Sequence, residues 1–187
     1  MRMTAAVLSL LLSAGAQAED VQALTAEGLA LIPPFQQQLL ETVKAAMQAG
    51  GPLKAVEACQ LQAPLIAAEH SRAPWRVGRT SLQVRNPANA ADAWEQDVLR
   101  QFAQRAAAGE PLASMQHSAV VAGEVRVMQA IAVGEPCLAC HGKTLKPELA
   151  ALLEQRYPQD QARGYELGAL RGAFTLRRSL ADAGVSQ

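Results

Sequence analysis

The chain has 187 residues, half of them apolar, and its 17 acidic and 17 basic side chains give a formal net charge of zero. This profile is typical of one ordinary globular domain. It contains no polybasic face, so nothing in the composition indicates nucleic acid binding.

The first 18 residues have the pattern of a secretory signal peptide. A short positively charged segment, Met1 to Met3, precedes an apolar run from Ala5 to Leu12, and Ala16-Gln17-Ala18 matches the A-x-A cleavage pattern. The apolar run is shorter than the roughly 20 residues that a membrane-spanning helix needs. We therefore expect residues 1–18 to be removed and residues 19–187 to form a soluble, periplasmic domain without a membrane span.

Two helical segments are predicted at the start of the mature domain. Apolar residues recur at helical spacing from Thr25 to Met47, and Pro33-Pro34 should kink or split this helix. Gly50-Gly51 ends it, and Pro52 suits the first position of a second helix over 53–69. The domain should therefore begin with a long, broken helix followed by a second one.

A strand, a turn and a capped helix are expected next. Apolar positions over 75–84 indicate the strand, and Asn86-Pro87-Ala88-Asn89 indicates the turn. Asp92 is followed three residues later by Glu95, which resembles a capping box that begins a helix over 93–107.

The second half of the chain is richer in β-forming residues. The runs 115–122 and 124–133 flank Gly123 and indicate a hairpin. A further helix is expected over 147–156, and a short last strand over 173–177. Helices first, then strands separated by single helices, predict an α+β fold with an antiparallel sheet in one domain.

The motif Cys137-Leu138-Ala139-Cys140-His141 follows the predicted hairpin and is the attachment pattern of a c-type haem. In that chemistry two thiols add to the two vinyl groups of haem, and the adjacent histidine binds the iron. We therefore expect one covalently attached haem c, with Cys137 and Cys140 as its thioether attachments and His141 as proximal axial ligand.

A zinc half-site and a redox dithiol are the alternatives for this motif. Zinc normally needs a second pair of Cys or His ligands, and only Cys59, His70 and His117 remain, none of them at ligand spacing. A redox dithiol does not need a histidine directly after its second cysteine. The haem interpretation is favoured, and a covalent haem would exclude thiol–disulfide chemistry at Cys137 and Cys140.

Cys59 is the third cysteine of the chain. Val56, Cys59 and Ala63 share one face of the second predicted helix, so the thiol is expected to be buried. An unpaired thiol in an oxidising compartment is a liability unless it is buried or bound. Cys59 is therefore either an inert, buried residue or a ligand of the haem iron.

Several short segments are specific in their order and spacing, although each is weak alone. They are Ala58-Cys59, Ala63-Pro64, Arg79-Thr80-Ser81-Leu82, Arg85-Asn86-Pro87-Ala88-Asn89, Trp94-Glu95, the Cys137 to Gly142 motif, and Tyr157 to Tyr165 with Gly168 and Arg171-Gly172-Ala173. As a set they resemble a family of exported single-haem c-type proteins with a PAS-like fold, long catalogued as a domain of unknown function. The resemblance implies a PAS-like antiparallel sheet with flanking helices, a haem between helix and sheet, and a cysteine thiolate opposite the proximal histidine. Cys59 stands at the position of that cysteine.

Other side chains are candidates for contacts with the haem. Arg79 and Arg85 can pair with haem propionates through two hydrogen bonds each, although arginines at strand ends are more often only solvated. If Cys59 is inert, another residue would be the second axial ligand of the iron, and the candidates are Met115, Met128, His70 and His117.

The sequence thus predicts a periplasmic c-type haem protein that carries or responds to single electrons, with His141 and Cys59 as axial ligands and an unidentified partner protein. We do not expect an enzyme, because peroxidase or oxygen chemistry needs an open iron position. The alternative is a haem-based redox or gas sensor, since PAS-like domains commonly sense and a displaceable ligand is a natural switch. Such a sensor would signal through a separate partner.

Overall fold

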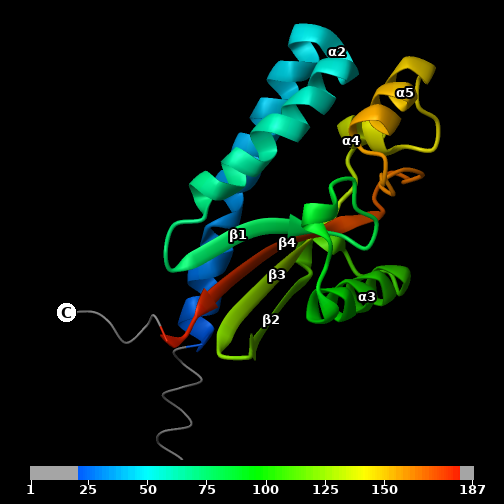
Figure 1. Cartoon of the computed structure of the whole chain (residues 1–187). Helices are drawn as coiled ribbons and strands as arrows, with labels where there is room; N and C mark the ends of the chain where they lie inside the picture. The colour runs from blue at the N-terminus through cyan, green and yellow to red at the C-terminus, as the bar shows by residue number, and fades with distance from the viewer. Residues whose placement is uncertain (1–20, 182–187) are drawn as a thin grey trace, which may run out of the picture.

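A four-stranded antiparallel sheet lies at the centre of the computed structural model, which describes residues 21–181 (Figure 1). The strands are β1 (Trp75–Thr80), β2 (Gln116–Val121), β3 (Glu124–Ala132) and β4 (Leu170–Ser179). Their order across the sheet is β1-β4-β3-β2, so the last strand of the chain pairs with β1 on one side and β3 on the other. The predicted signal peptide, residues 1–18, lies outside the described residues and stays a prediction.

The helix α2 (Ile32–His70) consists of two halves that lie side by side and run in opposite directions (Figure 1). Residues 21–30 are helical, Leu31 forms a turn, and Pro33-Pro34 lies in the first turn of α2, where the missing N–H is tolerated. Gly50-Gly51 interrupts the helical backbone, and the φ of 67° at Gly51 is in the left-handed region that favours glycine. Both predicted breaks in the helix are therefore confirmed.

Two apolar layers cover the two faces of the sheet. One joins α2 to the sheet and consists of Ile32, Phe35, Leu39, Ile66, Trp75, Val77, Val125, Val127, Phe174 and Leu176. The other joins α3 (Ala93–Ala107) to the opposite face and consists of Val98, Leu99, Phe102, Leu112, Met115, Met128, Ala130 and Ala173. Successive side chains of a strand point to opposite faces, which is why Val127 and Met128 of β3 belong to different layers. The predicted single-domain α+β fold is confirmed, and its arrangement is consistent with a PAS-like fold.

The predicted capping box of α3 and the predicted turn before it are both present in the structure. Asp92 Oδ1 accepts a hydrogen bond from the backbone N–H of Glu95 at 2.9 Å, and Glu95 Oε2 accepts one from the N–H of Asp92 at 3.0 Å. This capping box begins α3 where the sequence predicts it. The predicted turn is the short 3-10 helix η1 (Pro87–Asn89), and a second one, η2 (Leu112–Ser114), leads into the β2–β3 hairpin.

Two strands differ in length from their predictions. β1 ends at Thr80 instead of continuing to residue 84, because the Ser81 hydroxyl donates to the Arg171 carbonyl at 2.8 Å and Ser81 bridges to Ala90. β4 is longer than predicted because it has a neighbouring strand on both sides. No helix within residues 21–181 is long and apolar enough to cross a membrane.

Gly172 lies where β4 passes closest to the end of β1, and its replacement by alanine should be strongly destabilising. A Cβ atom at position 172 would lie 2.3 Å from the backbone oxygen of Thr80, and φ at Gly172 is +156°. A backbone atom inside a paired strand cannot move aside as a flexible side chain can. We expect Gly172→Ala to lower the free energy of unfolding by roughly 2–4 kcal/mol, from overpacking together with backbone strain.

Urea unfolding followed by circular dichroism measures this effect. The matched control is Gly78→Ala in β1, where the nearest atom to a new Cβ is Thr175 Cγ2 at an ordinary 3.8 Å. That control should change stability by less than about 1 kcal/mol in either direction, because its backbone is open to alanine. Equal effects of the two substitutions would contradict the explanation.

Candidate functional site

The Cys-x-x-Cys-His motif lies on the short helix α4 (Glu135–His141), which begins three residues after β3 ends. Cys137 and Cys140 are three positions apart along this helix, so their side chains lie on the same side of it. Both are free thiols that are partly exposed. The site therefore presents two neighbouring thiols, with a histidine directly after the second.

His141 is the last residue of α4, and only one of its ring nitrogens is engaged. Its Nδ1 lies 2.7 Å from the carbonyl oxygen of Ala162, and its ring meets that of Tyr165 edge-on with centroids 6.4 Å apart. A carbonyl only accepts, so the proton is on Nδ1 and Nε2 carries the lone pair. Within residues 21–181 Nε2 has no hydrogen-bond partner.

The surroundings of His141 keep its ring neutral. Burial, followed by the nearby cations Arg171 and Arg85, lowers the pKa of His141 to about 3, against the opposing effects of the Ala162 carbonyl and Asp160. A neutral imidazole with a free Nε2 is the form that binds metals. The histidine is thus prepared for coordination over the whole physiological pH range.

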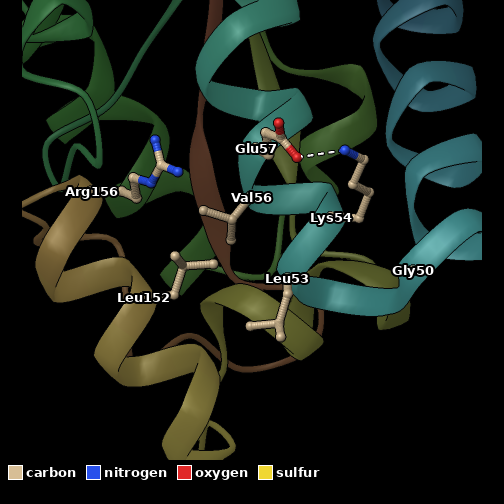
Figure 2. A pocket seen from close by; sticks show the side chains of 7 residues that line it. All are labelled: Gly50, Leu53, Lys54, Val56, Glu57, Leu152 and Arg156. Carbon is tan, nitrogen blue, oxygen red and sulfur yellow. Dashed lines mark hydrogen bonds and ion pairs between the residues drawn. The ribbon is translucent and has the colours of Figure 1, made fainter.

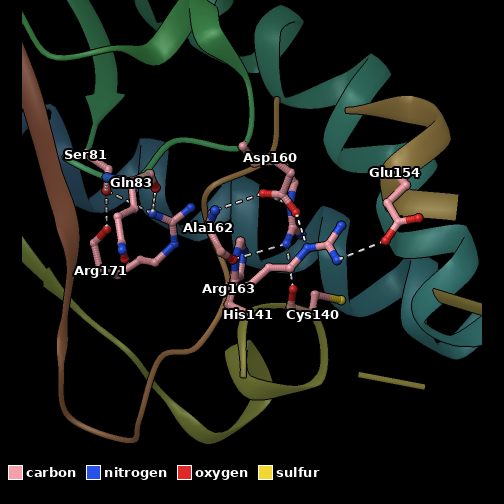
Figure 3. A network of polar contacts seen from close by, with 10 residues as sticks. Ser81, Gln83, Cys140, His141, Glu154, Asp160, Ala162, Arg163 and Arg171 are labelled. Atoms are coloured by element: carbon pink, nitrogen blue, oxygen red, sulfur yellow. Dashed lines mark hydrogen bonds and ion pairs between the residues drawn. The ribbon is translucent and has the colours of Figure 1, made fainter. Parts of the chain in front are cut away.

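The loop after α5 (Pro147–Arg156) holds the carbonyl that His141 contacts, as Figure 3 shows. Asp160 is 1% exposed, and its Oδ1 accepts hydrogen bonds from the N–H of Ala162 at 2.9 Å and from Arg85 Nε at 3.2 Å. Its Oδ2 accepts from Arg163 Nε at 2.8 Å. Burial by itself would raise the pKa of the Asp160 carboxyl, but the hydrogen bonds from Arg163 and Arg85 outweigh it and the pKa is lowered.

The structure places Cys59 in the second half of α2 with its side chain exposed, so the prediction that it is buried is wrong. Val56, one turn earlier, packs against α5, whereas no described element covers Cys59 in the same way. The protein nevertheless surrounds the thiol closely enough that partial burial raises its pKa, while Arg79 and Arg85 lower it. Cys59 is therefore exposed and lies within range of the charges of Arg79 and Arg85.

Helices α2, α4 and α5 meet beside this thiol. One apolar cluster consists of Val56, Leu149, Leu153 and Tyr157, and Cys140 packs against it. Cys59 is also close enough to Cys140 for the two thiols to influence each other. Burial is the main cause of the raised pKa of Cys140; Cys59 raises this pKa as well, whereas Arg85 lowers it. The fold thus brings Cys59 close to a motif that lies about 80 residues further along the chain.

The two arginines singled out by the sequence differ in their contacts. Arg85 is 11% exposed, and it donates to Asp160, to the Cys140 carbonyl at 2.6 Å and to the Ala162 carbonyl at 3.2 Å. The guanidinium of Arg79 has no hydrogen bond or ion pair to any residue in the described part of the chain, and burial lowers its pKa. Of the two, Arg79 is the one whose guanidinium can receive an anion.

Arg171 and Tyr165 also belong to the site; both stand in segments that carry the family resemblance, but Arg171 is not among the predicted haem contacts. The Arg171 guanidinium lies 5.2 Å from the centre of the Tyr165 ring and donates to Ser81 Oγ at 3.1 Å and to the Gln83 carbonyl at 3.3 Å. Ser81 and Gln83 are about 90 residues away from Arg171 in the sequence, so no local pattern marks these hydrogen bonds. Together with Arg79 and Arg85, Arg171 makes the site rich in cations.

The other candidate iron ligands lie elsewhere. Met115 and Met128 are fully buried in the layer between α3 and the sheet. His117 on β2 packs against Trp94, and His70 at the end of α2 has its Nε2 2.6 Å from the Gln38 side-chain oxygen. None of the four lies in the cluster against which Cys140 packs. Residues 21–181 contain no group of three or more Cys, His, Asp or Glu side chains that could hold a metal ion.

Two grooves flank Arg156, but neither includes a residue of the motif. The larger, about 300 Å³, lies between α2 and α5, and Figure 2 shows its lining residues Gly50, Leu53, Lys54, Val56, Glu57, Leu152 and Arg156. The smaller, about 220 Å³, is lined by Gln60, Asn86, Pro87, Arg156, Tyr157, Pro158 and Gln159. The site that contains Cys59, Cys137, Cys140 and His141 is distinct from both.

The fold and the site define a single-domain α+β protein in which a Cys-x-x-Cys-His helix lies beside a helical hairpin at the end of an antiparallel sheet. The chain belongs to the Tll0287-like family, whose model matches residues 12–179. Its structure is similar to the crystal structure of the cyanobacterial heme-protein Tll0287, with a TM-score of 0.59 and 23% sequence identity over 86% of this chain and 98% of that chain. At this identity the likeness establishes the shared fold. A comparison with curated proteins gave no match.

Proposed function

We propose that this protein carries one covalently attached haem c and transfers or responds to single electrons after export to the periplasm. The observation that carries the proposal is the Cys-x-x-Cys-His helix, whose histidine has Nδ1 bonded to a carbonyl and Nε2 free. The family to which the chain belongs includes a heme-protein of the same fold, which supports haem as the ligand. Haem supplies a one-electron redox centre; the protein chain supplies its attachment and ligands.

The residues of the site fit a covalent haem. Cys137 and Cys140 are free thiols on one side of α4, as thioether formation requires. His141 offers a neutral Nε2 for one axial position. The unpartnered guanidinium of Arg79 suits a propionate, because guanidinium and carboxylate pair through two hydrogen bonds. Arg85 already has three acceptors and is less suited to this role.

Cys59 is the proposed second axial ligand. Its thiol is accessible and lies near Cys140, Arg79 and Arg85. The two cations favour the thiolate, although burial has the larger and opposite effect on the pKa of Cys59. The competing ligands are engaged in other parts of the fold, with Met115 and Met128 in the core. Thiolate ligation favours ferric over ferrous iron, so the proposed protein has a low reduction potential. Two protein ligands also leave no open iron position, so we propose a role other than catalysis.

Mass spectrometry of matured protein tests the proposal directly. The mass should exceed that of the chain processed after Ala18 by one haem, and haem staining should survive denaturing electrophoresis, because thioether bonds resist denaturation. Complete removal of the colour by acid–acetone extraction would show that the haem is not covalent. A mass without haem, in cells that mature other c-type cytochromes, would overturn the proposal.

Carbon monoxide titration separates an electron carrier from a sensor. A carrier with two stable axial ligands should bind no carbon monoxide in the ferrous state and should exchange electrons quickly with small mediators. The sensor is the second candidate because Cys59 is exposed, so a small molecule can approach the iron on its side. Stoichiometric binding at low concentration, with a conformational change, would favour the sensor.

A further inference from the structure

We propose that Arg85 and Asp160 are positioning residues that hold the Ala162 carbonyl against Nδ1 of His141 and thereby set the reduction potential of the iron. This inference rests on the proposed function, since it concerns the iron that His141 would bind. It assigns a role to an ion pair that contacts neither the thiols of the motif nor the ring of its histidine.

The carbonyl of Ala162 controls the histidine through a hydrogen bond of 2.7 Å to Nδ1. A carbonyl that accepts a hydrogen bond from Nδ1–H fixes the tautomer and the ring orientation and makes Nε2 a stronger donor to the metal. A stronger donor stabilises ferric over ferrous iron, so this hydrogen bond lowers the potential. Because the acceptor is a backbone atom, its position depends on the residues that hold the loop.

Arg85 connects that loop to the helix that carries the histidine. Its Nη2 donates to the Cys140 carbonyl on α4 at 2.6 Å and to the Ala162 carbonyl at 3.2 Å, and its Nε donates to Asp160 at 3.2 Å. One planar side chain therefore contacts both the element that holds the ring and the carbonyl that accepts from it. A lysine carries the same charge on a single nitrogen atom, so it cannot donate hydrogen bonds to all three acceptors in the directions that the guanidinium uses.

Asp160 completes the arrangement from the loop side. Its Oδ1 accepts from both Arg85 and the N–H of Ala162, so the residue whose carbonyl faces His141 is held through its amide as well. The carboxylate and guanidinium are both nearly buried, with exposures of 1% and 11%, which restricts their motion. Two more backbone hydrogen bonds, from Gly164 to Gly142 and from Tyr165 to His141, keep the loop beside α4.

Charge-conserving substitution of Arg85 in the haem-loaded protein tests the inference. We expect Arg85→Lys to raise the potential by a shift of about tenfold in the ferric–ferrous equilibrium, which is about 59 mV for one electron. The ferric EPR spectrum should broaden or show a second low-spin species, because the histidine ring is no longer held in one orientation. A residue with only a structural role would lower the unfolding midpoint without changing either signal.

The matched control is Arg163→Lys, which makes the same substitution at the other arginine bound to Asp160. Arg163 contacts Oδ2 of Asp160 and the side chain of Glu154, and it donates to neither the Cys140 carbonyl nor the Ala162 carbonyl. It should therefore leave the potential and the EPR spectrum unchanged. Unchanged signals in Arg85→Lys, or equal changes in the two variants, would overturn the inference.

A double variant provides an independent test if one substitution reduces haem loading. Asp160→Asn preserves the shape of the side chain but removes its charge, so its bonds to both arginines weaken. If the two residues act through one contact, the double variant, Arg85→Lys combined with Asp160→Asn, shifts the reduction potential by less than the sum of the two single shifts. If the residues act independently through their charges, the shifts in potential add. Additive shifts would overturn the inference. Absence of haem from the wild-type protein would instead overturn the proposed function.

Discussion

Replacing Cys59 with alanine should raise the reduction potential by on the order of 100 mV or more, within the about 0.8 V range that axial ligands span. The thiolate is the ligand that favours ferric iron, so its loss removes the main cause of a low potential. The ferric low-spin thiolate signature should disappear from the absorption and EPR spectra. The haem should stay attached, because Cys137 and Cys140 are unchanged.

Two further variants make this result specific. Cys59→Ser keeps the size of the side chain and should give the same loss of the thiolate signature, since a neutral hydroxyl is a poor iron ligand. Leu61→Ala, at an exposed position two residues along the same helix, should leave both spectrum and potential as in the wild type. An unchanged ferric spectrum in Cys59→Ala would show that another residue holds the sixth position.

Replacing both Cys137 and Cys140 with serine should abolish covalent haem attachment. Only a thiol adds to a haem vinyl group in c-type maturation, and the hydroxyl of serine does not replace it. Haem staining on denaturing gels should fall to background, and the mass should equal that of the processed chain. Either single variant keeps one thiol and should retain some covalent haem, which separates loss of attachment from loss of the protein.

The double-serine variant also separates haem from zinc and dithiol alternatives. If the motif were a zinc site, the double-serine variant would lose metal, and if it were a dithiol, the variant would lose its redox titration. In neither case would the absorption spectrum in the visible range change. Persistent haem staining in the double-serine variant would contradict attachment through these cysteines.

Local patterns in the sequence determined most of the secondary structure. Asp92 and Glu95 form their capping box within three residues, and α3 begins where that box predicts. Gly50-Gly51 and Pro33-Pro34 break the N-terminal helices by their own backbone geometry, whatever packs around them. The Cys-x-x-Cys-His motif is also local, since five consecutive residues bring both thiols and the histidine onto one short helix.

Strand lengths and exposure could not be predicted in this way, because they depend on neighbours. β4 extends to ten residues because β1 and β3 pair with it on both sides, whereas β1 ends where Ser81 turns to the Arg171 carbonyl. Cys59 shares a helix face with Val56 and Ala63, and this pattern predicted that it is buried. A helix face is covered only where another element packs on it, and at Cys59 the described chain leaves the thiol exposed.

By itself the sequence determined the attachment motif and the α+β order of elements, because both depend on residues that are close together in the chain. Only the tertiary structure decided how the site is completed. The Arg85 side chain contacts residues that are 55, 75 and 77 positions away, and these contacts distinguish it from Arg79, whose guanidinium has no hydrogen bond or ion pair within the described chain. Sequence spacing cannot separate two arginines six residues apart, because their roles depend on which carbonyls and carboxylates the folded chain brings to each of them.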